Sequence, residues 1–320
     1  MNACIRIPNA YDRRAASVHG SDPGDTVHAM PRPQLLALGL EEILARALTE
    51  DVGAGDLTTE ACIDADTQAT ASAVARSSVV VCGGGVFDQV YKSVDPSLVV
   101  TSAVEEGAVV PAGTTLWTVR GRARSILMGE RVALNFVQRM MGIATMARTY
   151  VDAVAASGSS HTRISDTRKT TPGLRVLERY AVRVGGAYNH RDNLGSAVLI
   201  KDNHIAACGG VREAITRARA RAPHTSKIEC EVDSLEQLAV ALDAGVDIVL
   251  LDNMDDATVA RAIAEVKAHV ARGGGRVLTE ASGGITLARV PELARMGVDI
   301  ISVGALTHSV KAADIGLDFK

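Results

Sequence analysis

The sequence predicts an α/β protein with an N-terminal α/β sandwich domain and a C-terminal parallel β/α barrel. Its 320 residues are 47% hydrophobic but only 3% aromatic, so small aliphatic side chains must build the core, as in parallel sheets covered by helices. Short strand-like runs mixed with occasional helices fill the first part of the chain, which is typical of an α+β layer. After residue 158, apolar runs alternate with helical segments about every 20 to 30 residues, which indicates βα units.

The N-terminal part reads as short strands and helices that lead into one long helix. Residues 1–33 are polar and contain four prolines, so we expect a disordered tail there. A helix is expected at 35–48, followed by a polar, Gly-rich loop at 49–59. The other expected elements are strands within 70–84, 97–104 and 105–121, with a turn at 111–113, a helix at 86–94 and a long bridging helix at 125–158.

The C-terminal part carries six apolar runs, and polar residues follow most of them. The runs lie at residues 161–167, 197–203, 227–233, 247–253, 276–282 and 299–305. In β/α barrels the loops after the strands converge on one rim, where the active site lies. The residues at the ends of these runs include Arg168, Lys169, Lys201, Glu231, Asp252, Ser282, Gly283, Gly284 and Gly304. This order of cations, carboxylates and a Ser-Gly-Gly loop predicts a site on the rim of a barrel at residues 144–306.

Positive charge is concentrated in one segment of a slightly acidic chain. The formal net charge is −3, yet residues 163–201 hold eight Lys or Arg and only three Asp or Glu. The near-neutral balance and the scarcity of aromatic residues argue against a nucleic-acid partner. No apolar run reaches the roughly 20 residues that a membrane helix requires. Because a buried Arg or Lys is costly unless an anion pairs with it, the segment predicts an anion-binding site.

The cations of this segment receive different interpretations. Arg168 and Lys169 are adjacent, so in an extended segment they point to opposite sides and could bind two anionic groups. Further positive charge comes from His190, Arg191 and Lys201. Three other arginines recur every four residues and are interpreted as one solvated helix face: Arg175, Arg179 and Arg183.

The carboxylates and glycines at the strand ends suggest a second half of the site. Glu231 and Asp252 end consecutive strands, which would place them about 5 Å apart. Such a pair beside cations can hold a divalent metal, accept hydrogen bonds from sugar hydroxyls or exchange protons. Barrels often bind phosphate through backbone N–H groups after their last two strands, where Ser282–Gly284 and Gly304 lie. We therefore expect a pocket for an anionic substrate and a phosphosugar.

Cysteine usage and the N-terminus suggest an intracellular protein. The five cysteines are far apart and form no CxxC pair, which fits reduced thiols and argues against a structural zinc site. Charged residues interrupt the N-terminal segment, so it lacks the apolar region of a secretory signal. We expect a cytoplasmic location.

Nine motifs between Glu50 and Ser309 carry a family resemblance. They are "EDVGAGDLTT", "GERVALNFVQRMMGIAT", "DTRKTTPGLR", "YAVRVGGAYNHR", "LIKDNH", "EVDSLEQL", "LLDNM", "EASGGI" and "VGALTHS". With these motifs the sequence resembles the quinolinate phosphoribosyltransferases. The resemblance implies that quinolinate and phosphoribosyl pyrophosphate give nicotinate mononucleotide, pyrophosphate and carbon dioxide, a step of NAD biosynthesis. It implies Mg²⁺ with the pyrophosphate and no redox cofactor.

The resemblance also implies an architecture and an assembly. The α/β sandwich would span residues 34–143 and be completed by the returning C-terminus at 307–320. The barrel would be incomplete, with seven strands. Family members are dimers or larger, and each site takes an arginine from the neighbouring subunit; the matching residue here is Arg131.

Site residues are carried over from the family motif by motif. The implied substrate-binding residues are Arg131, Thr167, Arg168, Lys169, His190, Arg191, Lys201, Glu231, Asp252, Ser282, Gly283, Gly284, Ser302 and Gly304. Lys169, Lys201, Glu231 and Asp252 would be catalytic. The two carboxylates would face the ribose and hold Mg²⁺, partly through ligand and water. The cations would surround quinolinate, and the Ser-Gly-Gly loop with Gly304 would hold the 5′-phosphate.

The sequence departs from the family at two places, and it leaves three alternatives open. Gly185–Gly186–Ala187 stands where family members commonly have three glycines, and Asp192–Asn193 follows Arg191, where less acidic residues are expected. One alternative is a phosphoribosyltransferase that uses nicotinate, whose single carboxylate would leave several cations unpaired. Another is a barrel aldolase with Lys169 or Lys201 as its Schiff-base lysine, which borohydride trapping would reveal. The third is a non-catalytic anion-binding protein.

Overall fold

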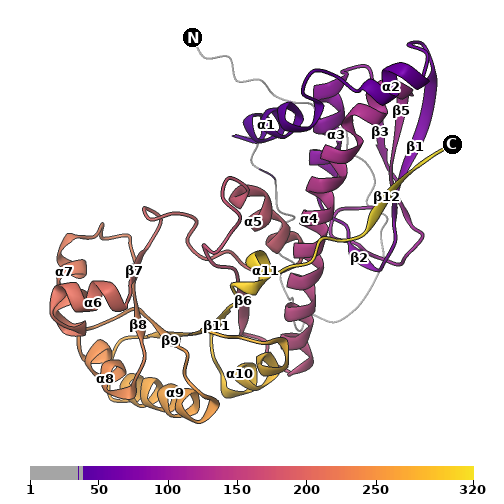
Figure 1. Cartoon of the computed structure of the whole chain (residues 1–320). Helices are drawn as coiled ribbons and strands as arrows, with labels where there is room; N and C mark the ends of the chain where they lie inside the picture. Colours follow the sequence, from indigo (N-terminus) through magenta and orange to yellow (C-terminus); the bar gives the residue numbers. More distant parts are fainter. Residues whose placement is uncertain (1–34, 36–38) are drawn as a thin grey trace, which may run out of the picture. The chain divides into compact units, whose positions relative to one another are not determined.

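The computed structural model describes Leu35 and residues 39–320 of the chain. The tail expected at residues 1–33 lies outside the described residues. The described chain is α/β, with an antiparallel sheet in its N-terminal part and a parallel sheet in its C-terminal part (Figure 1).

Two helices open the described chain, and they correct one expectation. Helix α1 spans Leu40–Val52, and helix α2 spans Leu57–Cys62. The loop expected at 49–59 is therefore mostly helical. The side chain of Asp56 accepts a hydrogen bond from the backbone N of Thr59 at 3.0 Å, which caps α2 at its N-terminus. A short capped helix inside a Gly-rich stretch explains why this segment reads as a loop in the sequence.

The N-terminal sheet has four strands in the order β12-β1-β5-β3. Its strands are β1 (Gln68–Ala75), β3 (Val99–Ser102), β5 (Thr115–Arg122) and β12 (Ile315–Phe319). All three neighbouring pairs are antiparallel. The turn expected at 111–113 separates β4 (Val109–Val110) from β5, but β4 pairs with β2 (Val79–Val80) in a separate small sheet. Helix α3 (Gly84–Val94) follows β2, as expected from its apolar spacing.

The C-terminal strand β12 joins the sheet formed by the first strands of the chain (Figure 1). The segment before it crosses helix α4 (Ala123–Ala156), the expected long helix. A Cβ on Gly142 of α4 would lie 2.2 Å from the carbonyl O of Lys311, so only glycine permits this crossing. Gln138 of α4 then donates from Nε2 to the carbonyl O of Ile315 at 2.8 Å. The C-terminus is thereby fixed against the middle of α4.

The parallel sheet has six strands in the order β6-β11-β10-β9-β8-β7. They are β6 (Arg163–Ser165), β7 (Val198–Ile200), β8 (Ile228–Val232), β9 (Ile248–Asp252), β10 (Leu278–Ser282) and β11 (Ile300–Ser302). Each of the six apolar runs of the sequence thus contains one strand. Beyond β6, the expected seventh strand is a single parallel bridge between Ser165 and Tyr188. One bridge instead of a ladder leaves the sheet open between Tyr188 and β7.

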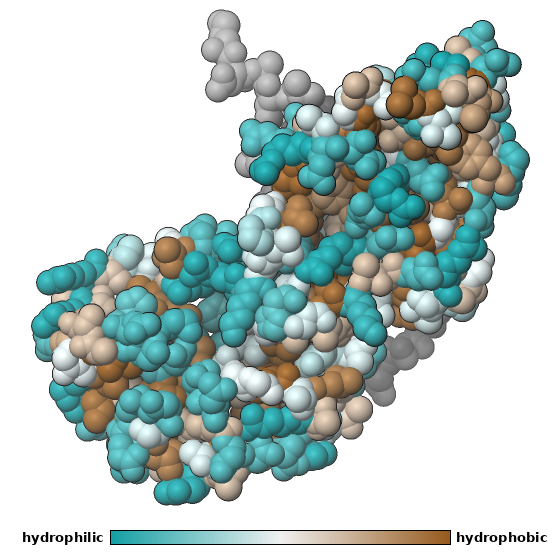
Figure 2. Space-filling model, viewed as in Figure 1, coloured by the Kyte–Doolittle hydropathy of each residue, from teal (hydrophilic) through white to brown (hydrophobic). Residues whose placement is uncertain are grey.

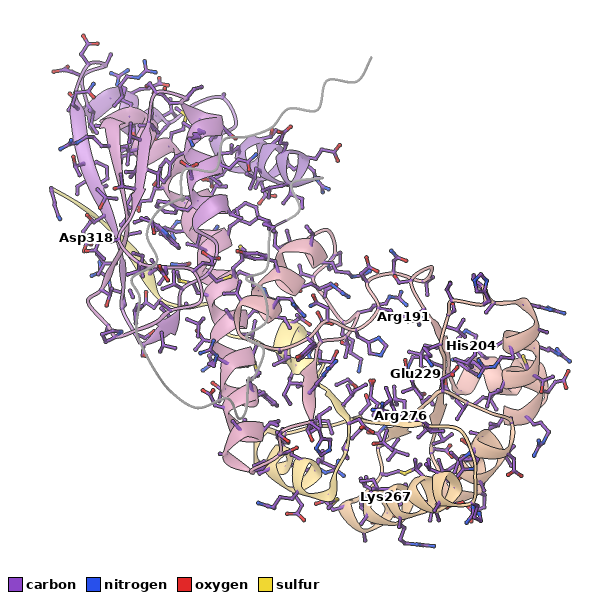
Figure 3. The ribbon with its side chains drawn as sticks, turned by 180° about the vertical axis from the view of Figure 1, so that it is seen from behind. Arg191, His204, Glu229, Lys267, Arg276 and Asp318 are labelled. Carbon is purple, nitrogen blue, oxygen red and sulfur yellow. The ribbon has the colours of Figure 1, made fainter. Side chains whose placement is uncertain are left out.

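Helices connect the parallel strands and carry the outer polar surface. They are α5 (Arg175–Val184), α6 (Asp202–Cys208), α7 (Val211–Arg221), α8 (Leu235–Asp243), α9 (Asp256–Ala271), α10 (Val290–Met296) and α11 (Ala305–His308), with a short 3₁₀ turn at Leu287–Arg289. Lys267 lies on α9, away from Arg191 and Glu229 (Figure 3). The face drawn in Figure 2 is mostly hydrophilic over α7–α10. Among the described residues, no helix is both long and apolar enough to cross a membrane.

Candidate active site

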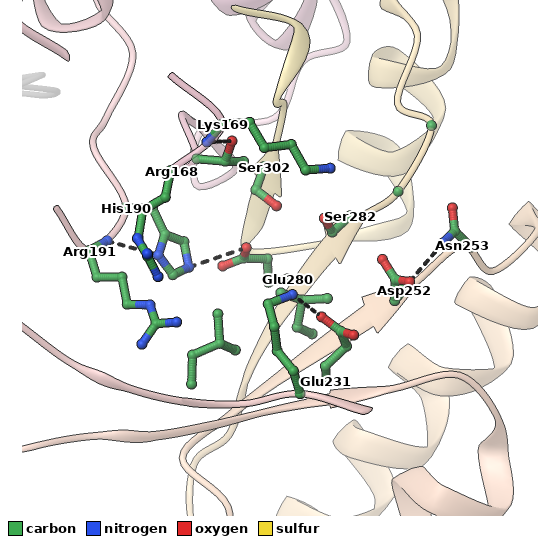
Figure 4. Close-up of a pocket in the computed structure, with 16 residues that line it drawn as sticks. Arg168, Lys169, His190, Arg191, Glu231, Asp252, Asn253, Glu280, Ser282 and Ser302 are labelled. Atoms are coloured by element: carbon green, nitrogen blue, oxygen red, sulfur yellow. Dashed lines mark hydrogen bonds and ion pairs between the residues drawn. The ribbon is translucent and has the colours of Figure 1, made fainter. Parts of the chain in front are cut away.

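A cavity of about 450 Å³ opens at the carboxyl ends of the parallel strands. Residues from all six strands or the segments that follow them line it: Thr167, Arg168, Lys169, His190, Arg191, Leu199, Lys201, Glu231, Leu250, Asp252, Asn253, Glu280, Ser282, Gly283, Gly284 and Ser302. In Figure 4, Arg168, His190 and Arg191 lie together at one end, and Asp252, Asn253 and Ser282 lie at the other. The cavity therefore has a cationic end and an end of carboxylate, amide and hydroxyl groups.

The cationic end begins with the loop after β6. Asp166 is fully buried, and its Oδ1 accepts a hydrogen bond from the backbone N of His190 at 2.7 Å. Its Oδ2 accepts from Asn189 Nδ2 at 2.6 Å. Burial holds the pKa of Asp166 above its usual value, although the nearby guanidinium of Arg179 and these hydrogen bonds partly oppose this effect. Asp166 thus joins the end of β6 to the segment that carries His190 and Arg191.

The arginines of α5 are not a solvated face, which corrects the sequence interpretation. The side chain of Arg179 is only 14% exposed and lies 3.9 Å from Asp166, and it donates to the carbonyl O of His190 at 2.6 Å. Arg175 donates to Thr170 Oγ1 at 2.9 Å. The guanidinium of Arg183 lies 5.5 Å from the ring centre of Tyr188. Periodicity alone could not show that two loops pack over this helix face.

Two buried hydrogen-bond donors of the cavity, one of them on Arg168, have no hydrogen-bond partner among the described residues, which suits an anionic ligand. Arg168 Nε is buried without a hydrogen-bond partner there, and so is Ser302 Oγ. Burial lowers the pKa of Arg191, and the neighbouring charge of Arg168 lowers it further. Unpaired buried donors cost free energy, and like charges repel. An anion bound between Arg168 and Arg191 would relieve both penalties.

His190 sits on two buried glutamates that sequence reasoning missed. Its Nε2 lies 3.3 Å from Glu229 and 3.5 Å from Glu280, which are 4% and 2% exposed. Burial lowers the pKa of His190, but the hydrogen bonds to Glu229 and Glu280 raise it to about 10. The backbone N of Arg191, 2.8 Å from Nδ1, favours a neutral ring instead. The negative charges of two buried carboxylates stabilise the protonated ring more than the single N–H dipole of Arg191 destabilises it, so His190 is a cation.

These three side chains could also meet around a metal ion, because their ligand atoms lie within 4.8 Å of one another. The chemistry of the neighbours opposes that role. Arg168 and Arg191 stand beside the trio, and their positive charges would repel a metal ion bound there. Glu229 was not predicted because it lies inside strand β8. The sequence of a buried parallel strand is read as an apolar run, and it does not indicate which single acidic residue faces the site.

Lys201 and Glu231 connect the two ends of the cavity. Lys201 Nζ is paired with Glu231 Oε2, and the side chains are 45% and 13% exposed. This pair joins the end of β7 to the end of β8. Lys201 also caps helix α6, since its backbone N donates to His204 Nδ1 at 3.0 Å. The ammonium of Lys201 thus brings a compact positive charge between the two ends of the cavity.

The other end of the cavity depends on close backbone packing between β9 and β10. The backbone N of Asn253 donates to the carbonyl O of Ser282 at 3.1 Å, and Asn253 Nδ2 donates to Asp252 Oδ2 at 2.7 Å. Asn253 has a positive φ of 54°. A Cβ on Gly283, whose φ is 84°, would lie 2.2 Å from Asn253 Oδ1. Glycine is therefore required at 283, and it leaves Asp252 and Ser282 side by side at the cavity.

Twelve of the fourteen predicted substrate-binding residues line this cavity. The two exceptions within the described chain are Arg131 and Gly304. Arg131 is exposed on α4. Gly304 precedes α11, where a Cβ would lie 3.1 Å from Lys169 Cδ. The cavity residues absent from the predicted set are Leu199, Leu250, Asn253 and Glu280.

Comparison with known proteins identifies the family. The model of the quinolinate phosphoribosyl transferase C-terminal domain matches residues 143–318, and that of the N-terminal domain matches residues 56–141. The chain belongs to the quinolinate phosphoribosyl transferase family. The resemblance that the sequence motifs indicated is thereby confirmed.

Relatives of this family from distant organisms match most of the chain. The nicotinate-nucleotide pyrophosphorylase (carboxylating) of Mycobacterium leprae is 45% identical over 284 residues, which cover 87% of this chain and 96% of that protein. The chloroplastic protein of the same name from Arabidopsis thaliana is 37% identical over 325 residues, 97% of this chain and 91% of that one. The crystal structure of NadC from Streptococcus pyogenes has a TM-score of 0.82 at 40% identity, covering 90% of this chain and 99% of that chain.

Proposed function

We propose that the protein transfers the phosphoribosyl group of phosphoribosyl pyrophosphate to quinolinate with decarboxylation. The products are nicotinate mononucleotide, pyrophosphate and carbon dioxide, as in de novo NAD biosynthesis. The observation that carries the proposal is the two-ended cavity, with Arg168, Lys169 and Arg191 facing Asp252 and Ser282, in a member of this family.

The cationic end suits a pyridine that carries two carboxylates. Quinolinate has two negative charges, and Arg168, Arg191 and Lys201 offer positive charge from three different segments. Arg forks bind carboxylates in a bidentate way, whereas Lys acts as a compact charge. Ion pairs from several directions fix the ring in the cavity and orient its nitrogen toward the ribose. A single carboxylate, as in nicotinate, would leave part of this charge unpaired.

The opposite end suits the ribose and its phosphate. As pyrophosphate leaves, positive charge develops at the anomeric carbon, and the carboxylates of Glu231 and Asp252 can stabilise it. Ser282, Gly283 and Gly284 offer a hydroxyl and backbone N–H groups to the 5′-phosphate. After ribosylation the ring nitrogen is cationic and stabilises the electron pair left on ring carbon 2 when the 2-carboxylate departs as carbon dioxide, and a proton from solvent then binds to that carbon. These bond changes require no redox cofactor.

Glu231 and Asp252 also fit Mg²⁺. Their oxygens are the hard donors that Mg²⁺ prefers, and both line the cavity at neighbouring strand ends. When bound, Mg²⁺ would neutralise charge on the pyrophosphate leaving group. Glu231 is shared with Lys201, so Asp252 is the more available ligand.

The finer features of the fold and assembly are part of the same proposal. We infer an N-terminal α/β sandwich at residues 34–143 with 307–320, and an incomplete barrel at 144–306 whose seventh strand is reduced to Tyr188. The pairing of β12 with β1 supports the first. We infer a homodimer in which Arg131, exposed on α4, enters the neighbouring site. The four free cysteines of the described chain fit the cytoplasm.

One assay tests the proposal. The purified protein is incubated with quinolinate, phosphoribosyl pyrophosphate and Mg²⁺, and carbon dioxide and nicotinate mononucleotide are measured. We expect equal amounts of both products, and little turnover when nicotinate replaces quinolinate. Product without release of carbon dioxide, or faster reaction with nicotinate, would contradict the assignment of the acceptor.

A further inference from the structure

Arg139 of helix α4 makes a set of contacts that the proposed chemistry does not use. Its Nε and Nη2 donate to Glu178 Oε1 at 3.1 and 2.8 Å. Its Nη2 also donates to Thr171 Oγ1 at 3.2 Å and to the carbonyl O of Thr307. The side chain of Glu178 on α5 is only 1% exposed. One guanidinium therefore joins α4 to Thr171 and Glu178, which are close in the sequence, and to the distant Thr307 of α11.

These contacts fix the loop at residues 166–174, which carries two cations of the cavity, Arg168 and Lys169. Glu178 Oε2 accepts a hydrogen bond from the backbone N of Thr171 at 3.1 Å, so Glu178 holds the backbone N–H of Thr171 and Arg139 holds its hydroxyl. Thr307 Oγ1 donates to the carbonyl O of Lys169 at 2.9 Å. The loop at residues 166–174 is thus held at Lys169 and at Thr171, while the Lys169 side chain lines the cavity.

We propose that Arg139 is a positioning residue for the loop at 166–174 and acts through it on the site. Nη2 of Arg139 reaches a carboxylate, a hydroxyl and a carbonyl, and Nε adds a second hydrogen bond to the carboxylate that the single nitrogen of a lysine could not make. Its loss would free the loop and move Arg168 and Lys169 out of register with the cavity. The kinetic part of this inference rests on the proposed function, whereas the effect on the loop does not.

Arg148 provides a matched control on the same helix. Its Nε donates to the carbonyl O of Gly185 at 2.9 Å, just after the last residue of α5. Arg148 therefore links α4 to the end of α5, as Arg139 links α4 to α5, but its hydrogen bond to Gly185 does not involve the 166–174 loop. A general weakening of the α4–α5 contact should appear in Arg148→Gln, and an effect on the loop should appear only in Arg139→Gln.

The first measurement is hydrogen–deuterium exchange of the whole protein without ligand. In Arg139→Gln we expect the amides of residues 166–174 to exchange about tenfold faster or more, and in Arg148→Gln we expect them to be unchanged. Unchanged exchange in Arg139→Gln, or equal acceleration in both variants, would overturn the inference. If Arg139→Gln does not fold, Arg139→Lys is compared in the same way, because it keeps the charge opposite Glu178.

The second measurement is steady-state kinetics. We expect Arg139→Gln to raise the KM of quinolinate about tenfold or more, to change the KM of phosphoribosyl pyrophosphate less than about twofold, and Arg139→Lys to be intermediate. Equal changes in both KM values would indicate a merely structural role and contradict the inference. An inactive wild-type protein would refute the proposed function, and the exchange experiment would still decide on the loop.

Discussion

Replacing Gly283 by alanine should damage the site far more than the same replacement at its neighbour Gly284. Both residues have positive φ, 84° and 56°, and each alanine would store about 1–2 kcal/mol of backbone strain. Only at Gly283 would the new Cβ meet other atoms, 2.2 Å from Asn253 Oδ1 and 2.8 Å from its backbone N. The forced shift adds about 1–3 kcal/mol. We expect losses of about 2–5 kcal/mol for G283A and about 1–2 kcal/mol for G284A.

The assay for this prediction compares denaturant unfolding and kinetics of the two variants. Asn253 is hydrogen-bonded to Ser282, so its displacement moves the ends of both β9 and β10. Under the proposed function, the KM of phosphoribosyl pyrophosphate should rise about tenfold or more in G283A and much less in G284A. If the two variants had the same stability and the same KM values, the close packing between Gly283 and Asn253 would not be needed and the reasoning would be wrong.

Three further predictions concern assembly, pH and metal. Arg131→Ala and Lys201→Ala should each abolish turnover with the fold retained, and mixed, re-equilibrated subunits should regain about a quarter of the wild-type activity, because half of the dimers would then hold one intact site; no recovery would exclude a shared site. The hydrogen bonds from Ser97 are the main cause of the lowered pKa of Asp95, aided by Ser125 and Arg122. The stabilisation that ionised Asp95 contributes is therefore present above about pH 4 and is lost on acidification. Asp95→Asn should lower the free energy of unfolding at pH 7 by about 1–3 kcal/mol and make this free energy fall less steeply below pH 4, as urea titrations would show. Chelation of Mg²⁺ should stop turnover and leave the melting temperature nearly unchanged, since the proposed ligands lie in an open cavity; a large fall in melting temperature would point to a structural metal.

The sequence predicts the strands and their polar ends better than it predicts what packs on them. Each apolar run after residue 158 became a strand, because buried parallel strands leave a clear aliphatic signal. The same signal hides Glu229, an inward-facing acid in the middle of such a run. Arg179 was misinterpreted for a related reason, since helical spacing defines a face but not whether a loop covers it. Tertiary contacts also decided that β4 pairs with β2, although α3 and β3 lie between them in the sequence.

The sequence predicts most of the site residues for a different reason. Arg168, Lys201 and Asp252 follow strands directly, and the carboxyl ends of parallel strands must share one edge, so order along the chain becomes proximity in space. Glu280 lies two residues before the end of β10 and contacts His190 from inside the sheet. Its role depends on the depth of the cavity, which no spacing in the sequence encodes.

The position of β12 has a consequence for biosynthesis. The ribosome makes β1 and β5 early, but their sheet gains the strand next to β1 only when the last residues of the chain emerge. The first layer to be translated is therefore the last to be completed, and until then β1 exposes an unpaired edge. A tag fused directly after Lys320 would extend from this edge strand and should disturb folding yield more than catalysis.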